Sequence, residues 1–191
     1  VWQMLLGHMK PAGLTFSSLK RTVIGGSACP PAMITAFQDV YGVTVLHAWG
    51  MTEMSPVGTY NSPKSARDDQ AEAGLSDRRL KQGRSLFGVD MRIVDAAGRE
   101  LAWDGATAGE LLVRGAWICR RYFRAEADAI DADGWFPTGD IATIDADGFL
   151  QITDRSKDVI KSGGEWISSV ELENIAVGHP DVAEAAVIAA R

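Results

Sequence analysis

Three side chains in the segment His-Ala-Trp-Gly-Met-Thr-Glu, residues 47–53, are of types that bind nucleotides. Small residues flank Trp49, so we expect one face of its ring to be open for stacking against a purine. Thr52 offers a hydroxyl to a phosphate oxygen, and Glu53 offers a carboxylate to the Mg²⁺ that neutralises phosphates. Each residue also has a structural explanation, because tryptophans are commoner in cores than on base platforms and a glutamate can simply start a helix.

A second polar group lies in the last third of the chain. Asp140 follows a Thr-Gly pair, and a carboxylate fixed at the entrance of a strand can accept both hydroxyls of a ribose. A turn-capping aspartate is an equally good explanation. Arg155 could join Asp140 on the sugar, or pair at the surface with Asp154 or Asp158.

Two lysines and a glycine pair follow this group. Lys157 and Lys161 are four residues apart in a segment that we expect to be extended, so both could face one phosphate or carboxylate, or both could be solvated. Gly163 and Gly164 suit a moving lid or a narrow channel wall, although two glycines do not make a phosphate loop. Trp166 would seal that wall or pack on the helix that follows.

Other residues with chemical potential have simpler explanations. The glycines of the Gly-Gly-Ser segment 25–27 allow a backbone to approach a flat ligand, but they equally form a tight turn. Cys29 and Cys119 lie far apart without metal-ligand spacing, so we expect both to be buried as small apolar residues. No Ser/His/Asp arrangement is present, and we expect structural roles for the three scattered histidines, His8, His47 and His179.

The elements that must position these residues begin as a βαβ pattern. A β-prone run over 19–24 is followed by a helix that starts at Pro30 and ends at Gly42, and by a strand over 43–46. This order predicts a parallel sheet. It also places residues 47–53 in a loop at the carboxyl end of a strand, where open α/β sheets bind ligands.

The rest of the chain predicts a different architecture. Polar residues dominate 61–85, which we expect to be an exposed connection, and a compact antiparallel β region follows with strands over 87–94, 109–114, 141–144 and 149–152. After residue 154 we expect a β-prone run to 161, the glycine loop, a helix ending near 178 and a strand over 182–190. Ser168 and Glu171 have the spacing of a capping box at the start of that helix.

Composition excludes several classes of protein. With 191 residues and 46% hydrophobic content, the chain has enough apolar side chains for a sizeable core. Its net charge of −6 lacks the basic surface of a nucleic-acid binder, so we expect no DNA or RNA partner. No apolar run approaches the roughly 20 residues of a transmembrane helix, and we expect a cytoplasmic protein. Both ends interrupt an apolar pattern, so we expect a fragment of a longer chain.

Three segments, 47–53, 134–140 and 154–173, strongly resemble motifs of the adenylate-forming enzymes, specifically medium- or long-chain fatty-acyl-CoA ligases. The resemblance covers nearly the whole chain, and its motifs occur in the expected order. Residues 163–169 are more similar to fatty-acid ligases than to the adenylation domains of peptide synthetases. The resemblance implies an α/β fold: residues 1–153 would be the later part of the large AMP-binding domain, 154–157 a hinge, and 158–191 the start of a small α+β lid domain.

The same resemblance implies roles for individual residues. Thr52 would contact phosphate, Glu53 would hold Mg²⁺, and Asp140 and Arg155 would bind the ribose. Thr52, Glu53 and Lys161 would then be the catalytic residues. Lys157 would lie at the hinge, and Gly163 and Gly164 beside the entry of coenzyme A. Lys161 and Trp166 would approach the nucleotide in one lid orientation. The adenine pocket would be formed by Gly26, His47, Ala48 and Trp49. Trp49 replaces the tyrosine usual in the family, and stacking should survive that change.

The reaction implied by the resemblance has two steps. A fatty acid and ATP give acyl-AMP and pyrophosphate, and coenzyme A then displaces AMP to give the thioester. The phosphate loop of the family should precede residue 1 and its catalytic lysine should follow residue 191, so we expect this chain alone to be unable to form the adenylate. A ligase for an aryl, amino or luciferin-like acid, a non-catalytic nucleotide-binding module, and a homodimer all remain open.

Overall fold

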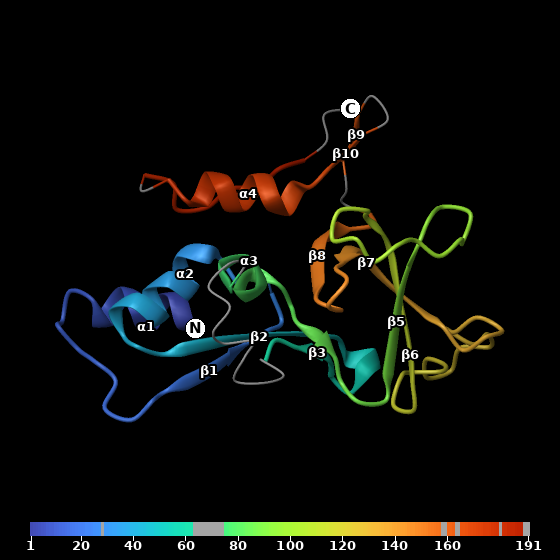
Figure 1. Ribbon diagram of the computed structural model, residues 1–191, viewed down its shortest axis with the longest axis horizontal. Coiled ribbons are helices and arrows are strands. Elements are labelled where there is room, and N and C mark those ends of the chain that lie inside the picture. The colour runs from blue at the N-terminus through green and yellow to red at the C-terminus, as the bar shows by residue number, and fades with distance from the viewer. Residues whose placement is uncertain (28, 63–74, 158–159, 163–164, 180, 189–191) are drawn as a thin grey trace.

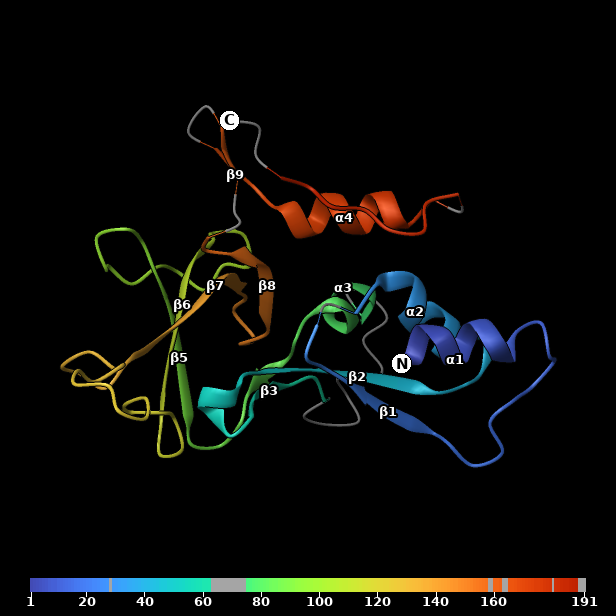
Figure 2. The same ribbon diagram turned by 180° about the vertical axis from the view of Figure 1, so that it is seen from behind.

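Two four-stranded sheets lie side by side, with helices α1 and α2 on the first sheet and a C-terminal segment beyond them (Figure 1). The structure is a computed structural model that describes residues 1–27, 29–62, 75–157, 160–162, 165–179 and 181–188. Figure 2 shows the same arrangement from behind. In the described part, no helix has the length and apolar character needed to cross a membrane.

The first sheet contains the predicted βαβ unit. Its strands lie in the order β1 (Arg21–Ile24), β2 (Thr44–Gly50), β3 (Val57–Tyr60) and β4 (Arg84–Ser85). The pair β1–β2 is parallel, as predicted, whereas β3 and β4 add antiparallel strands. The connection between β1 and β2 is α2 (Pro31–Thr35), which continues as a π-helix (Ala36–Val40). The sheet is therefore mixed.

A hydrophobic cluster holds the helices against this sheet. Phe37 is fully buried at its centre, and the rings of Trp2 and Phe16 lie 5.5 and 6.1 Å from the Phe37 ring. Trp2 begins α1 (Trp2–Met9), so this contact fastens the first helix of the chain to the βαβ unit. Burial of such large aromatic surfaces is a main source of stability in a small unit.

The second sheet is the predicted antiparallel region. Its strands are β5 (Val89–Val94), β6 (Gly109–Gly115), β7 (Phe136–Ile144) and β8 (Leu150–Arg155), each paired with the next. Alternate side chains of β5 and β6 enter the core, as expected for a sheet with one solvated face. Strand β7 begins well before the predicted position 141. Asp140 therefore lies inside a strand, where its neighbours on β6 and β8 restrain the backbone.

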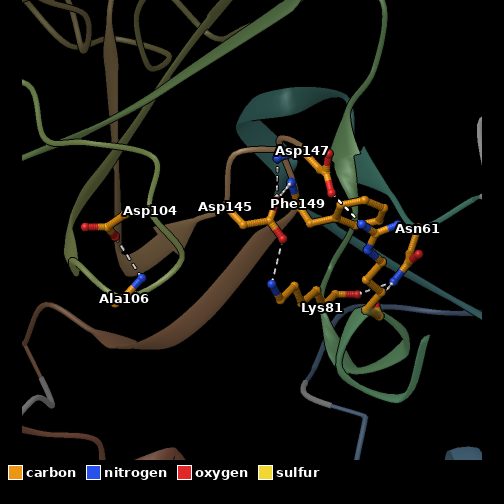
Figure 3. A network of polar contacts seen from close by, with 8 residues as sticks. Asn61, Lys81, Asp104, Ala106, Asp145, Asp147 and Phe149 are labelled. Atoms are coloured by element: carbon orange, nitrogen blue, oxygen red, sulfur yellow. Dashed lines mark hydrogen bonds and ion pairs between the residues drawn. The ribbon is translucent and has the colours of Figure 1, made fainter. Parts of the chain in front are cut away.

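A network of polar contacts joins the two sheets (Figure 3). Helix α3 (Leu75–Leu80) precedes Lys81, whose Nζ lies 2.7 Å from Oδ2 of Asp145 in the β7–β8 turn. The amide of Asn61 donates to the Lys81 carbonyl, and the backbone N–H of Gln82 donates to the Leu150 carbonyl at 2.9 Å. The prediction of an exposed connection is therefore wrong for 80–84, which are buried or half-buried. Its polar side chains indicated solvent, but several of them pair with the neighbouring sheet.

The C-terminal segment differs from the predicted order. A hairpin of β9 (Ile160–Ser162) and β10 (Glu165–Ile167) precedes α4 (Ser169–Val177). The Ser168 hydroxyl, directly before α4, donates to the Thr153 carbonyl; the predicted capping box stays a prediction, because the side chain of Glu171 lies outside the described residues. The backbone N–H of Ser169 donates to Asp154 Oδ2 at 2.7 Å, and its hydroxyl donates to Oδ1 at 3.1 Å. A carboxylate on β8 thus holds the start of α4.

The predicted strand over 182–190 is also wrong where the structure describes it. Residues 181–188 form neither helix nor strand. Their apolar character alone predicted a strand, but a strand needs a neighbour for its backbone groups. The β9–β10 hairpin pairs with itself and supplies no such neighbour in the described part of the chain.

The sheet junction generates a stability prediction. In the full-length protein, Asp145→Ala should lower the free energy of unfolding by about 2 kcal/mol, because Lys81 and two backbone N–H groups lose a partner in a half-buried position. The matched control, Asp147→Ala, removes a more exposed ion pair with Arg78 and should cost less than about 1 kcal/mol. Urea denaturation followed by circular dichroism measures both; equal losses would contradict the importance of the Lys81–Asp145 pair.

Candidate functional site

The buried carboxylate of Asp140 contacts two other residues selected from the sequence, Trp49 and Arg155. The indole Nε1–H of Trp49, at the end of β2, donates to Asp140 Oδ2 on β7 at 3.0 Å. The Arg155 Nη1 atom lies 2.9 Å from the other oxygen, Oδ1. Arg155 is the direct neighbour of Asp140 across the β7–β8 pair, so the strand register itself places its charge there. The fold thus brings together residues from both sheets.

The environment of Asp140 opposes its ionisation. The side chain is 3% exposed, and this burial raises the pKa of the Asp140 carboxyl, while Arg155 and the Trp49 hydrogen bond act in the opposite direction. A carboxylate has about four acceptor positions, and the two donors engage one on each oxygen. The remaining positions allow Asp140 to accept hydroxyl groups. The Arg155 guanidinium pairs with Asp140, whereas Asp154 accepts hydrogen bonds from Ser169 and from the Arg155 backbone N–H. The alternative partner Asp158 lies outside the described residues.

The turn that contains Gly25 and Gly26 packs closely against the backbone of Ala48, next to Trp49. Ile24, the last residue of β1, is paired with His47, so the turn that contains Gly25 and Gly26 continues beside Ala48. A Cβ atom on Gly25 would lie only 2.8 Å from the Ala48 carbonyl oxygen, which explains the glycine at that position. The predicted loop at 47–53 is partly wrong, because β2 extends to Gly50. The longer strand fixes the direction of the Trp49 side chain.

Thr52 and Glu53 lie in a 3-10 turn (Thr52–Met54) directly after β2. Thr52 is exposed, whereas Met54 is fully buried and anchors the turn in the core of the second sheet. Oε1 of Glu53 accepts a hydrogen bond from the Tyr122 hydroxyl at 2.8 Å. Tyr122 was not selected from the sequence, because local sequence patterns do not indicate which distant residue a tyrosine in a polar loop will contact.

His47 is a neutral, buried residue. It is 2% exposed, and burial lowers the pKa of its ring below the ordinary value. Nδ1 lies 3.3 Å from the Leu80 carbonyl oxygen and 3.5 Å from Gln82 Nε2. Gln82 lies beside it and accepts the Ile152 N–H on Oε1 at 2.7 Å. Gln82 therefore links the strand that carries His47 to β8, a role that its polar sequence context did not indicate.

The candidates selected after β8 are only partly covered by the described residues. Lys157 lies exposed in a turn after β8, so the prediction of one extended segment carrying both lysines is wrong. The backbone of Lys161 pairs with that of Trp166 across the β9–β10 hairpin, which projects away from both sheets in Figures 1 and 2. The side chains of Lys161 and Trp166, and all of Gly163 and Gly164, lie outside the described residues.

The two cysteines differ in their surroundings. Cys29 is buried, and burial raises the pKa of its thiol to about 11, so it is an unreactive thiol as predicted. Cys119 is only half-buried, and its thiol donates to the Arg121 carbonyl at 3.4 Å, so the prediction of burial is wrong there. Cys29 and His47 line a cleft of about 460 Å³ between α4 and the two sheets, which Trp49 and Asp140 do not line.

Comparisons with known proteins show the family of the chain. The sequence profile of the AMP-binding enzymes matches residues 1–123, and the chain belongs to this family. A 3-methylmercaptopropionyl-CoA ligase from Ruegeria pomeroyi is 55% identical over 188 residues, 98% of this chain and 35% of the relative. A medium-chain-fatty-acid–CoA ligase from Ectopseudomonas oleovorans is 52% identical over 191 residues, 100% of this chain and 35% of the relative. The chain thus spans about a third of the length of these relatives.

Solved structures show the same fold. The o-succinylbenzoate coenzyme A synthetase from Bacillus subtilis, in complex with ATP and magnesium ion, matches with a TM-score of 0.80 and 29% identity, over 98% of this chain and 37% of that chain. Its complex with AMP matches with a TM-score of 0.81 and 28% identity, over 100% of this chain and 37% of that chain. The α/β fold expected from the resemblance is confirmed.

The contacts of Gln82 generate a prediction. Gln82→Leu in the full-length protein should lower the free energy of unfolding by about 2 kcal/mol, because the Ile152 N–H loses its partner. The control Gln151→Leu changes an exposed glutamine on the same strand as Ile152 and should change the stability by less than about 0.5 kcal/mol. Thermal or urea unfolding checks this, and a neutral Gln82→Leu would contradict the linking role of Gln82.

Proposed function

We propose that this chain carries nucleotide-binding residues of an AMP-forming acyl-CoA ligase. The observation that carries the proposal is the Asp140 carboxylate held between the Trp49 indole and the Arg155 guanidinium, with Thr52 and Glu53 directly after the same strand. An aromatic face, a hydroxyl acceptor and a phosphate-binding turn are the three elements needed to recognise adenine, ribose and phosphate. The names of the relatives, all CoA ligases of small or fatty acids, support the same activity.

The resemblance to the adenylate-forming enzymes supplies the individual roles. In this proposal Trp49 stacks on adenine, and Gly26, His47 and Ala48 form the wall of the adenine pocket. Asp140 accepts the ribose hydroxyls, because it retains acceptor positions beside its two donors. Arg155 places a cation against that carboxylate and so opposes the rise in the Asp140 pKa that burial causes. The Trp49 hydrogen bond sets the angle between the base platform and the sugar-binding group.

Magnesium fits the phosphate end of this site. The described residues contain no group of three or more His, Cys, Asp or Glu side chains that could hold a metal by themselves. Mg²⁺ at nucleotide sites is commonly held by one or two carboxylates together with phosphates and water, so the single Glu53 carboxylate matches this chemistry. When bound, the ion offsets negative charge on the phosphates. Thr52 donates its hydroxyl to a phosphate oxygen in the same turn.

The reaction proceeds by two substitutions. A carboxylate oxygen of the acid attacks the α-phosphorus of ATP, and the bond to the β-phosphate oxygen breaks to release pyrophosphate. The thiol sulfur of coenzyme A then attacks the acyl carbon, the thiol proton leaves, and AMP departs. In this proposal residues 1–153 are the later part of the large AMP-binding domain, 154–157 act as a hinge, and 158–191 begin a small lid domain. Lys157, Lys161, Gly163, Gly164 and Trp166 act in the lid steps, with Lys161 approaching the nucleotide.

The acid is a medium- or long-chain fatty acid in this proposal. The support is the name of the Ectopseudomonas relative and that of a long-chain-fatty-acid–CoA ligase from Thermus thermophilus, which is 43% identical over 192 residues. The 55% identity to 3-methylmercaptopropionyl-CoA ligases favours a second candidate, a short thioether acid. A screen of the full-length protein for acid-dependent ATP–pyrophosphate exchange, with fatty, thioether, aryl and amino acids, tests the activity. The proposal fails if no acid supports exchange while the protein binds ATP, because the protein would then be a nucleotide-binding module.

The Trp49–Asp140 contact predicts a graded effect on AMP affinity in the full-length protein. Trp49→Phe keeps a stacking face but loses the Nε1–H donor, so it should weaken AMP binding about tenfold. Trp49→Ala should weaken it by about a hundredfold, because stacking is lost as well. The control Trp103→Phe changes a tryptophan outside the cluster and should leave the affinity unchanged. Isothermal titration calorimetry measures the three variants, and an unaffected Trp49→Ala would contradict the stacking role.

The raised pKa of Asp140 predicts the pH dependence of nucleoside binding. Protonation removes an acceptor that the ribose needs, so affinity for adenosine should be highest above the folded pKa and fall as the pH drops through it. The fall should begin above the ordinary aspartate pKa of about 3.9. Adenosine is the probe because it has no titrating phosphate. Asp140→Asn should bind weakly with a flat pH profile, whereas an unchanged profile in this variant would contradict the assignment.

A further inference from the structure

The long loop at 116–135, between β6 and β7, is fastened to the turn that carries Glu53. The Cys119 N–H donates to the Glu53 carbonyl at 2.7 Å, and the Ser55 hydroxyl donates to the Trp117 carbonyl at 3.3 Å. The Tyr122 hydroxyl adds a third contact, at 2.8 Å, to Oε1 of the Glu53 carboxylate. Tyr122 and Glu53 are 69 positions apart in the sequence. The loop therefore restrains both the backbone and the side chain of Glu53.

The chemistry of the Tyr122 contact suits a cation ligand. A phenol is a neutral donor and brings no positive charge to the Glu53 carboxylate, whereas a lysine or arginine partner would. One oxygen, Oε1, is engaged. The structure gives the other oxygen, Oε2, no hydrogen bond or ion pair within the residues that it describes. A carboxylate fixed through one oxygen has fewer orientations to lose when the other oxygen binds an ion.

The Tyr122 contact has little to contribute to the stability of the fold. The side chain is 51% exposed, and Tyr122 is absent from both hydrophobic clusters of the described residues. Hydrogen bonds at such exposed positions contribute little net free energy, because water replaces the lost partner. The backbone contact of Cys119 already fixes the position of the turn. The specific consequence of the phenol is therefore the orientation of the Glu53 carboxylate.

We propose that Tyr122 is a positioning residue for Glu53, which holds Oε1 and leaves Oε2 for the magnesium of the bound nucleotide. The inference rests on the proposed function, because the magnesium role of Glu53 belongs to it. Such second contacts to a metal ligand orient the ligand and raise its affinity for the ion. The adenine and ribose contacts of Trp49 and Asp140 do not involve Tyr122. Its loss should weaken metal binding selectively.

The test measures metal affinity separately from nucleotide affinity. Full-length protein saturated with a non-hydrolysable ATP analogue is titrated with Mn²⁺, and free Mn²⁺ is followed by electron paramagnetic resonance. Tyr122→Phe should raise the dissociation constant of Mn²⁺ about tenfold. Loss of a residue that orients a metal ligand commonly weakens metal binding by about 10- to 100-fold. Affinity for adenosine and the unfolding midpoint should stay unchanged. The control Tyr41→Phe removes a phenol from a ring packed on Phe16 and should change nothing.

A double-mutant cycle completes the test. In a Glu53→Gln background, Tyr122→Phe should have no further effect on Mn²⁺ affinity, because Tyr122 acts only through the carboxylate. An unchanged Mn²⁺ affinity in Tyr122→Phe overturns the inference, as does an equal loss in the Glu53→Gln background. A parallel loss of adenosine affinity also overturns it, since that would indicate a structural role. If the wild-type complex binds no Mn²⁺, the magnesium role of Glu53 in the proposed function fails as well.

Discussion

The arrangement of this molecule depends on one buried carboxylate. Asp140 is 3% exposed, and its charge is tolerated only because the indole of Trp49 and the guanidinium of Arg155 supply a donor to each oxygen. Arg155 comes from the adjacent strand, but Trp49 comes from the other sheet. The two sheets must therefore keep a fixed relation, or a buried acceptor loses its partner. The three side chains that join the two sheets here are also those proposed to bind the nucleoside.

Several contacts away from Asp140 maintain that relation. The Lys81–Asp145 pair fastens the first sheet to the β7–β8 turn (Figure 3). The backbone hydrogen bond from Gln82 to Leu150 adds a contact to the start of β8. The loop at 116–135 fastens the second sheet to the turn after β2, through Cys119 and Glu53. The end of β2 is thus held from two sides. Binding residues on rigid, doubly fastened elements lose little entropy when a ligand arrives.

Local patterns in the sequence predicted the βαβ unit, the antiparallel region and the residues of the Asp140 cluster, because these depend on periodicity and on residue type. The extent of β7 was not predictable, since Pro137 and Gly139 indicate a turn, whereas pairing with β6 extends the strand. Gln82 and Tyr122 were missed because their partners lie far away in the sequence. The strand expected at 182–190 depended on a neighbour that local patterns cannot supply.

A crystal structure of the full-length protein with AMP tests the central claim most directly, which is that residues of the two sheets form one nucleotide site around Asp140. The account predicts adenine on the face of Trp49 and the ribose hydroxyls hydrogen-bonded to Asp140, while Arg155 stays paired with the same carboxylate. AMP bound at another surface, or bound with its ribose turned away from Asp140, would contradict the account.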